Sequence, residues 1–235
     1  MSIEWKYTKD NPLKVFTTFS GYDSQCLALK YIGIPFTLIG WSEIDDAAIK
    51  AHNAIFPEYS DVNYGDISKI DWSKVPDFDL LTYSSPCQDF SNAGLQAGGD
   101  EGSGTRSSLL WEVKRCILEK RPKYLLMENV KALVSEKFRP TFLKWCDWLT
   151  GQGYTSFSQV MNSRDHGCPQ NRERIFVVST LESSWFNFPQ PQELKLRLKD
   201  VLEENVDEKY YLDDVRVAQF VSGLEKDKVK KICSD

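Results

Sequence analysis

The order of apolar and helical segments limits the possible folds of this chain of 235 residues more than its composition does. Apolar runs at 13–19, 36–43, 77–84, 123–130 and 174–180 are typical of strands, and 155–161 is a further candidate. Helical signals fall between them, at 23–33, 46–55, 106–120 and 138–154. Strands that alternate with helices predict an α/β fold: an open, mostly parallel, Rossmann-like sheet with helices on both faces.

The composition is that of an ordinary globular protein, with 41% hydrophobic and 27% charged residues. No apolar run approaches the roughly 18 residues that a membrane span needs. The first residues, "MSIEWKYTKDNPLK", lack the apolar core of a secretory signal, so we expect a cytoplasmic protein. The net charge of −5 argues only weakly against nucleic-acid binding, because phosphate contacts need local Lys and Arg.

Six cysteines are scattered along the chain without a CxxC pair, so we expect neither disulfides nor a metal site. Most cysteines of this kind are small core residues. Cys87 differs because it follows a predicted strand, in "SSPCQDFSNAG", and precedes a segment with five glycines at 94–104. A nucleophilic thiolate needs such a partly exposed position. The glycines fit either a surface loop or a lid that closes.

In open α/β sheets, ligands bind beyond the carboxyl ends of the strands. Residues 19–21, Glu43, 86–88 and Glu128 all fall at predicted strand ends. An acid at position 43 can accept hydrogen bonds from ribose hydroxyls. Glu128 can cap a following helix, or hold a proton and donate a hydrogen bond to a ring nitrogen. Arg172 and Arg174 fit either surface ion pairs or planar forks that bind phosphate or a carbonyl oxygen.

The pattern weakens after Thr180, where prolines, acids and a short basic segment mix. We predict a first domain at 1–184 and a second region at 185–235, which is an incomplete recognition part or a linker.

Seven segments, taken in order, resemble the motifs of the DNA (cytosine-5) methyltransferases: "FSG", "SEID", "GDIS", "SPCQDFS", "GTRSSLLWE", "LLMENV" and "GCPQNRERIFVV". The resemblance covers roughly residues 14 to 180. It implies the fold of the S-adenosylmethionine-dependent methyltransferases. It also implies transfer of a methyl group from S-adenosylmethionine to carbon 5 of a cytosine flipped out of double-stranded DNA, typical of restriction-modification enzymes.

The resemblance carries roles onto individual residues. It implies that Cys87 adds to carbon 6 of the cytosine, that Glu128 binds ring nitrogen 3, and that Arg174 holds the carbonyl oxygen. Arg172 would hold the catalytic loop or a phosphate. The implied cofactor-binding residues are Phe19, Gly21, Glu43, Ile44, Asp66, Ile67, Pro86 and Leu109.

The chain departs from the family pattern in two places. Members usually have an acid before the first Phe and further glycines after its Gly, whereas this chain has Thr17, Asp23 and Ser24. Members also carry a target-recognition domain and a final Gly-Asn motif, which residues 181–235 do not contain. A second polypeptide that supplies these parts is therefore an expected partner. The alternatives are a non-catalytic or truncated DNA-binding remnant and an RNA cytosine methyltransferase of the same fold.

Overall fold

The computed structural model describes residues 7–86, 106–182 and 185–232. The chain divides into two compact units, Met1–Leu194 and Lys195–Asp235. The boundary that we predicted after residue 184 adjoins residues outside the described ranges and stays a prediction.

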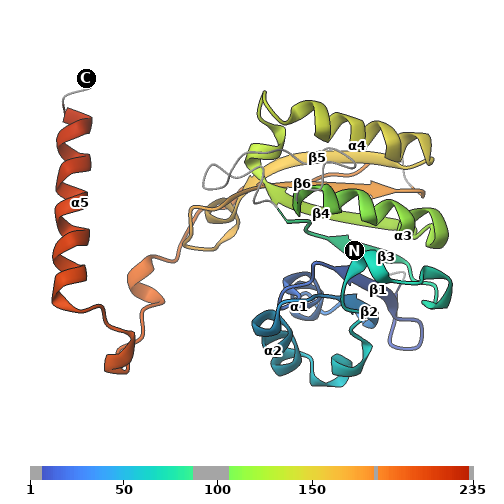
Figure 1. Ribbon diagram of the computed structural model, residues 1–235, viewed down its shortest axis with the longest axis horizontal. Helices are drawn as coiled ribbons and strands as arrows, with labels where there is room; N and C mark the ends of the chain where they lie inside the picture. The colour runs from blue at the N-terminus through green and yellow to red at the C-terminus, as the bar shows by residue number, and fades with distance from the viewer. Residues whose placement is uncertain (1–6, 87–105, 183–184, 233–235) are drawn as a thin grey trace. The chain divides into compact units, whose positions relative to one another are not determined.

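In the described residues of the first unit, six strands form one sheet in the order β2-β1-β3-β4-β6-β5 (Figure 1). The four strands β2, β1, β3 and β4 are parallel, whereas β6 is antiparallel to both β4 and β5. The predicted open, mostly parallel sheet is therefore confirmed. The strands are β1 (Leu13–Thr18), β2 (Phe36–Ser42), β3 (Leu80–Tyr83), β4 (Tyr124–Val130), β5 (Thr155–Asn162) and β6 (Glu173–Thr180).

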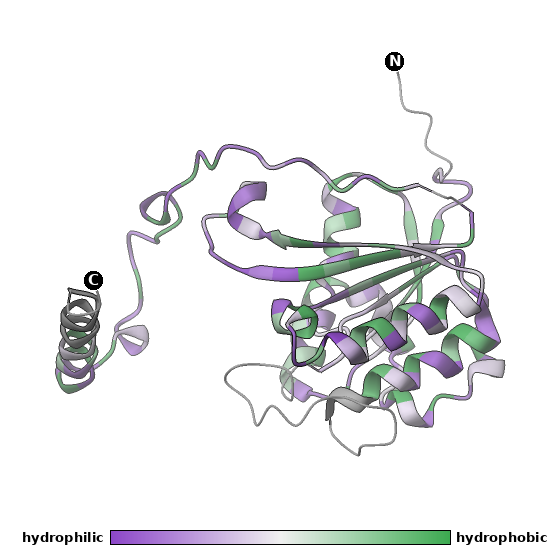
Figure 2. Ribbon diagram, turned by 90° about the horizontal axis from the view of Figure 1, so that it is seen from above, coloured by the Kyte–Doolittle hydropathy of each residue, from purple (hydrophilic) through white to green (hydrophobic). Residues whose placement is uncertain are grey.

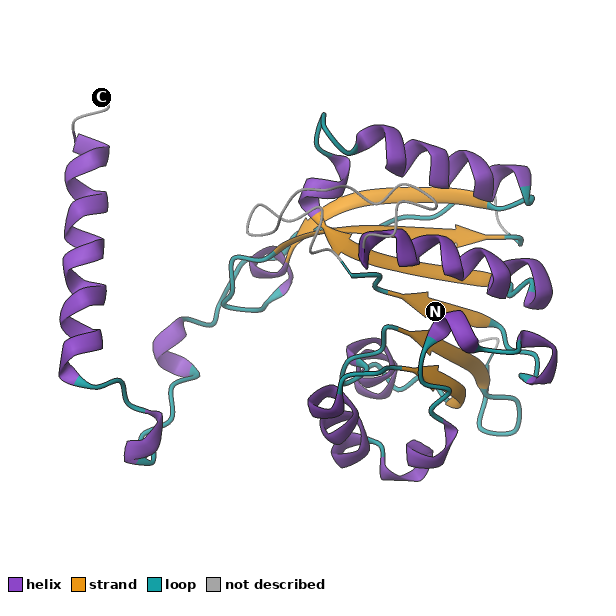
Figure 3. Ribbon diagram, viewed as in Figure 1, coloured by secondary structure: helices purple, strands orange, loops and turns teal. Residues whose placement is uncertain are grey.

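Helices cover both faces of the sheet, as predicted (Figure 3). Successive side chains of a strand point to opposite faces, and β1 shows this directly. Val15 packs in a cluster with Cys26 of α1, whereas Phe16 packs in a second cluster with side chains of α3 and α4. The helices of this unit are α1 (Ser24–Tyr31), α2 (Asp46–Ile55), α3 (Val113–Lys120) and α4 (Arg139–Gly151).

The helices α1 and α2 each begin after an aspartate whose side chain caps the helix. Asp23 accepts a hydrogen bond from the Cys26 backbone N–H, and Asp45 accepts one from Ala48. The predicted helix at 106–120 is only partly α-helical, because Arg106–Glu112 forms a 3₁₀ helix. Leu110 and Trp111 are both buried in the same core cluster, and tertiary packing decides the local geometry there.

The register between β1 and β2 shifts between Val15 and Phe16. Gly40 lies at this irregularity. A Cβ atom built at Gly40 would lie 2.5 Å from the ring of Tyr64 and 2.6 Å from the ring of Phe16. Glycine is therefore required by space, since both rings occupy the place of a side chain.

The second unit contains short 3₁₀ helices and one long helix, α5 (Asp214–Ile232), which our reading of the sequence did not predict. Figure 2 shows strands that are mostly hydrophobic and helices that carry both kinds of residue. Val217, Phe220 and Val221 of α5 recur at helical spacing and are 45%, 65% and 48% exposed. In the described residues, no helix has both the length and the apolar character that crossing a membrane requires.

Candidate active site

The four parallel strands β2, β1, β3 and β4 end at the same edge of the sheet, and side chains join those ends in pairs. The Gly21 backbone N–H after β1 donates to Glu43 Oε2 after β2, at 2.9 Å. Asn129 near the end of β4 donates from Nδ2 to the Ser85 carbonyl oxygen after β3, at 3.1 Å, and to Ser85 Oγ at 3.2 Å. The topology thus brings together the strand ends that the sequence singled out.

Glu43 is half-buried and is fixed by three backbone donors. Its Oε1 accepts from Ile44 N at 2.8 Å and from Asp45 N at 3.0 Å, and its Oε2 accepts from Gly21. A carboxylate offers about four acceptor positions, so one position on Oε2 remains for a ligand hydroxyl. The acid is held in place before any ligand binds.

A neighbouring segment, 63–66, is attached to the end of β2. Asn63 Oδ1 accepts from the N–H groups of Glu43 and Gly65, at 3.3 and 2.9 Å, and Asn63 Nδ2 donates to the Glu43 carbonyl oxygen. Asp66 follows and caps a 3₁₀ helix, Ile67–Lys69. The hydrogen bonds from Ser68 hold the pKa of Asp66 below its ordinary value. An ionised acceptor, Asp66, therefore lies three residues after Asn63, whose side chain is bound to the Glu43 backbone.

The remaining cofactor residues predicted from the sequence are placed in different ways. Phe19 is half-buried and has a φ of 54°, in the left-handed region. Ile44 is 70% exposed, whereas Ile67 is only 3% exposed and packs in the core. Pro86 and Leu109 are half-buried and flank the part of the chain that lies outside the described residues.

Glu128 and Arg174 form an ion pair between β4 and β6, with Glu128 Oε1 at 3.0 Å from Arg174 Nε. The two side chains are only 23% and 22% exposed. Burial raises the pKa of Glu128 above its ordinary value, against the opposing effect of Arg174 and Arg172. The group is therefore easier to protonate than a surface glutamate, and it can then donate a hydrogen bond.

Arg172 is exposed and lies close enough to Glu128 to affect its pKa. Its backbone N–H donates to Asn162 Oδ1 at 3.1 Å, and Asn162 Nδ2 donates to Asn171 at 2.7 Å. Asn162 is 8% exposed and thus fastens the connection between β5 and β6. This side chain holds the backbone from which Arg172 extends.

Cys87 and the whole glycine segment at 94–104 lie outside the described residues. The structure does describe the residues that lead into Cys87: Ser85 is 3% exposed and is bound by Asn129, which is 2% exposed. Three other cysteines are poor nucleophiles. Burial raises the pKa of Cys26, of Cys116, and of Cys146, the last to about 11.

Sequence reasoning gave no role to three asparagines whose side chains bind the backbone at Glu43, Ser85 and Arg172: Asn63, Asn129 and Asn162. Asn129 and Asn162 lie at the ends of strands, where a side-chain amide can bind backbone groups that the sheet leaves unpaired, whereas Asn63 follows a 3₁₀ helix. The strand end was a usable signal for Asn129 and Asn162.

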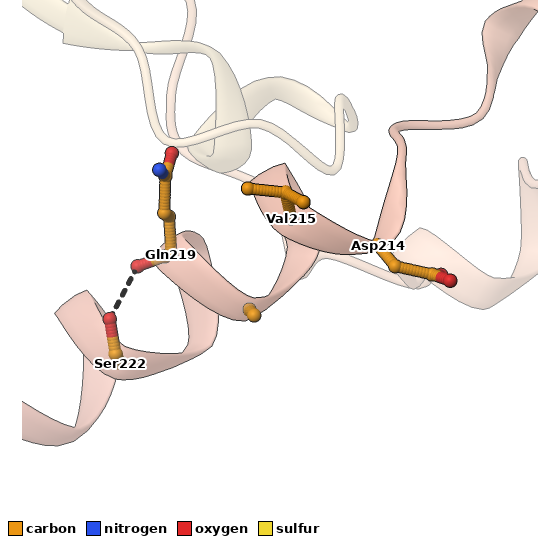
Figure 4. Close-up of a pocket in the computed structure, with 5 residues that line it drawn as sticks. Asp214, Val215, Gln219 and Ser222 are labelled. Atoms are coloured by element: carbon orange, nitrogen blue, oxygen red, sulfur yellow. Dashed lines mark hydrogen bonds between the residues drawn. The ribbon is translucent and has the colours of Figure 1, made fainter.

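The hollows in the described residues include one beside Arg174 and one on α5. One, of about 610 Å³, is lined by Val130, Lys131, Ala132, Val134, Ser135, Glu173 and Arg174, and so borders the ion pair with Glu128. Lys131 closes it by an ion pair with Glu173 at 2.9 Å. The other is lined only by α5 residues (Figure 4), none of which we predicted for the site.

Solved structures share this fold. The chain matches Schizosaccharomyces pombe Dnmt2 methyltransferase with a TM-score of 0.67, over 90% of this chain and 66% of that one, at 20% identity. It matches the Entamoeba histolytica methyltransferase EhMeth with a TM-score of 0.69, over 86% of this chain and 63% of that one, at 22% identity. The fold is that of the S-adenosylmethionine-dependent methyltransferases.

Sequence comparison narrows this class. The family model of the C-5 cytosine-specific DNA methylases matches residues 13–231, and the chain belongs to that family. Its members use S-adenosylmethionine as methyl donor. The chain is 40% identical to the type II methyltransferase M2.ScrFI of Lactococcus lactis subsp. cremoris, over 88% of this chain and 72% of that protein. It is 35% identical to the orphan methyltransferase M.Rho11sI of Bacillus phage rho11s, over 94% of this chain but 49% of that protein.

Proposed function

We propose that this chain is the catalytic part of a DNA (cytosine-5) methyltransferase of the restriction-modification type. It transfers a methyl group from S-adenosylmethionine to carbon 5 of a flipped cytosine through a covalent adduct with Cys87. The observation that carries the proposal is the partly buried pair of Glu128 and Arg174, 3.0 Å apart at the edge of the sheet. Family membership supports the same reaction.

The covalent step solves a chemical problem. Carbon 5 of a pyrimidine is a poor nucleophile, and addition of the Cys87 thiolate to carbon 6 places electron density on carbon 5. The cofactor, held at the ends of β1 and β2, would supply an electrophilic methyl group to carbon 5 and would leave as a neutral thioether. Loss of the proton from carbon 5 and elimination of the thiolate from carbon 6 restore the aromatic ring.

Glu128 and Arg174 would stabilise the charge that this addition creates on the ring. Protonated Glu128 donates to ring nitrogen 3, and its raised pKa favours that form. The Arg174 guanidinium holds the carbonyl oxygen. The hollow beside Arg174 offers room for a base that has left the duplex.

The cofactor would bind along the ends of β1 and β2. Gly21 and Glu43 are already joined there, and the free acceptor position on Glu43 Oε2 suits a ribose hydroxyl. Asp66 supplies an acceptor for an adenine amino group, and Phe19, Ile44, Pro86 and Leu109 supply apolar contacts. Ile67 contributes through its backbone, since its side chain is buried in the core.

A mechanism-based trap tests the reaction. A duplex whose target cytosine carries fluorine at carbon 5 cannot lose a proton there, so the adduct persists and shifts the protein on a denaturing gel. We expect a cofactor-dependent adduct with the unaltered chain and none with Cys87→Ala. Cys146→Ala, on α4 and outside the site, is the matched control and keeps the adduct.

Assays with duplex DNA and with tRNA distinguish the DNA methyltransferase from the alternative functions. Methyl transfer to tRNA but not to duplex DNA would replace the DNA assignment with the RNA one. Cofactor binding without any adduct would identify a non-catalytic remnant.

The activity further requires a second polypeptide that carries target recognition. The chain spans 72% and 49% of the two curated relatives above, so those proteins contain parts that it does not match. The exposed apolar residues of α5, among them Val217, Phe220 and Val221, are the kind of surface that such a part would cover.

Methyl transfer to duplex DNA, measured with and without a polypeptide that carries the missing recognition part, tests this requirement. We expect the second polypeptide to stimulate methyl transfer. Phe220→Asp should weaken this stimulation, whereas Gln219→Asp, at the exposed neighbouring residue, should leave it intact. Robust sequence-specific methylation by the chain alone would refute the requirement.

A further inference from the structure

Two polar side chains at the ends of the loop that follows β1, Thr17 and Asp23, are hydrogen-bonded to each other. Thr17 Oγ1 donates to Asp23 Oδ2 at 3.0 Å. Their exposures are 1% and 0%, so neither can exchange its partner for water.

The bond closes the loop that follows β1. Between the two residues lie Phe19 and Gly21, and Phe19, Gly21 and Asp23 all have left-handed backbone conformations, with φ of 54°, 57° and 64°. The Asp23 backbone N–H donates to the Ser20 carbonyl oxygen at 2.8 Å. Such a conformation is unfavourable for a phenylalanine, and it persists only where its surroundings enforce it.

The Asp23 carboxylate has several partners in this enclosed cluster. Oδ1 accepts from the Cys26 backbone N–H at 3.2 Å, which starts α1. Oδ2 also lies 3.8 Å from Nε2 of His52 in α2, whose side chain is fully buried. Thr17 Oγ1 in turn is 2.8 Å from Ser20 Oγ. One carboxylate therefore accepts hydrogen bonds from donors of β1 and α1.

We propose that Asp23 is a positioning residue for cofactor binding, and that a carboxylate at position 17 can replace the one at position 23, because the two side chains are in direct contact. The pair holds Phe19 and Gly21 in the shape in which Gly21 reaches Glu43. One carboxylate at either position supports the loop. Two carboxylates would repel each other, and the absence of both would leave buried donors without an acceptor. The inference rests on the proposed role of this loop in binding S-adenosylmethionine.

A double-mutant cycle tests whether a carboxylate at position 17 can replace the one at position 23. The variants are Thr17→Asp, Asp23→Gly and the combination of both, and the readout is the dissociation constant of labelled S-adenosylmethionine in equilibrium dialysis. We expect each single change to weaken binding about tenfold or more, and the combination to return to within about threefold of the unaltered chain. Glycine also suits the left-handed conformation at position 23.

Thr17→Ser and Thr17→Val decide the question without adding a charge. Serine keeps the hydroxyl donor and retains affinity, whereas valine, of the same shape, loses it. Binding that is equal in all variants, or single losses that simply add in the combination, would overturn the inference. Absence of cofactor binding by the unaltered chain would instead count against the proposed function, so the two failures are distinguishable.

Discussion

The carboxyl group of Glu128 experiences two opposing effects. Burial disfavours its charged form, and the guanidinium groups of Arg174 and Arg172 favour it. The pKa of Glu128 is raised, so burial has the larger effect. In its protonated form, the carboxyl group can donate a hydrogen bond to a ring nitrogen. After it loses the proton, it can form the ion pair with Arg174 again.

Glu128→Gln separates the catalytic from the structural consequence. We expect methyl transfer at saturating cofactor to fall about 100-fold, because a charge-stabilising contact is weakened. A carboxyl with a raised folded-state pKa contributes stability that is present at low pH and is lost as pH rises through that pKa. Urea unfolding should therefore show the stability of the unaltered chain falling relative to Glu128→Gln as pH increases through this range.

Glu173→Gln is the matched control for that change. Glu173 pairs with Lys131 at 2.9 Å, but the two side chains are 45% and 56% exposed. Exposed pairs contribute little to stability, so this variant should stay within about 1 kcal/mol of the unaltered chain. A pH dependence shared by both variants would contradict the assignment to Glu128.

Asn129 connects the proposed ring-binding acid to the segment before Cys87. Asn129→Ala leaves the buried Ser85 carbonyl oxygen without its side-chain donor, and we expect a loss of about 1–3 kcal/mol in the free energy of unfolding. The maximal rate of methyl transfer should fall while the affinity for cofactor stays unchanged, because the cofactor loop is elsewhere. Steady-state kinetics and cofactor dialysis measure the two effects. An equal loss of both would contradict this role.

Among the elements, the irregular pairing of β1 with β2 depends on Gly40. Gly40→Ala places a methyl group against the rings of Phe16 and Tyr64, and we expect destabilisation by about 1–3 kcal/mol in urea unfolding. Gly151 of α4 has no atom within 4 Å of a built Cβ. Gly151→Ala should therefore be neutral or more stable by up to about 1 kcal/mol. Equal effects at both glycines would show that space around Gly40 is not the cause.

At the scale of the whole molecule, the sheet and all the proposed catalytic and cofactor residues belong to the unit Met1–Leu194. We expect a chain truncated after Leu194 to unfold cooperatively and to bind S-adenosylmethionine with an affinity close to that of the full chain. Circular dichroism during thermal unfolding and equilibrium dialysis check this. Loss of the cooperative transition would mean that Lys195–Asp235 completes the core of the first unit.

The same residues show how far sequence reasoning reached. Strand ends could be located because the apolar runs mark the strands, and the carboxyl ends of parallel strands lie at one edge of the sheet. The positions of Glu43 and Glu128 at that edge were therefore predicted from the pattern alone. The partners of Asn63 and Asn129 could not be predicted, because a side-chain amide binds whichever backbone groups the fold brings near. The helix α5 was missed because its apolar residues stand within a strongly charged segment.

By itself, the sequence determined the α/β class and the order of its elements, because these depend on local periodicity and on chemistry within a few residues. The ordered motifs also determined the family. Only the tertiary structure decided that Arg174 meets Glu128, that Asn129 binds Ser85, and that Thr17 and Asp23 share one buried hydrogen bond. The first two pairings join residues far apart in the chain and depend on strand order, whereas the third depends on the fold of one loop and on its burial.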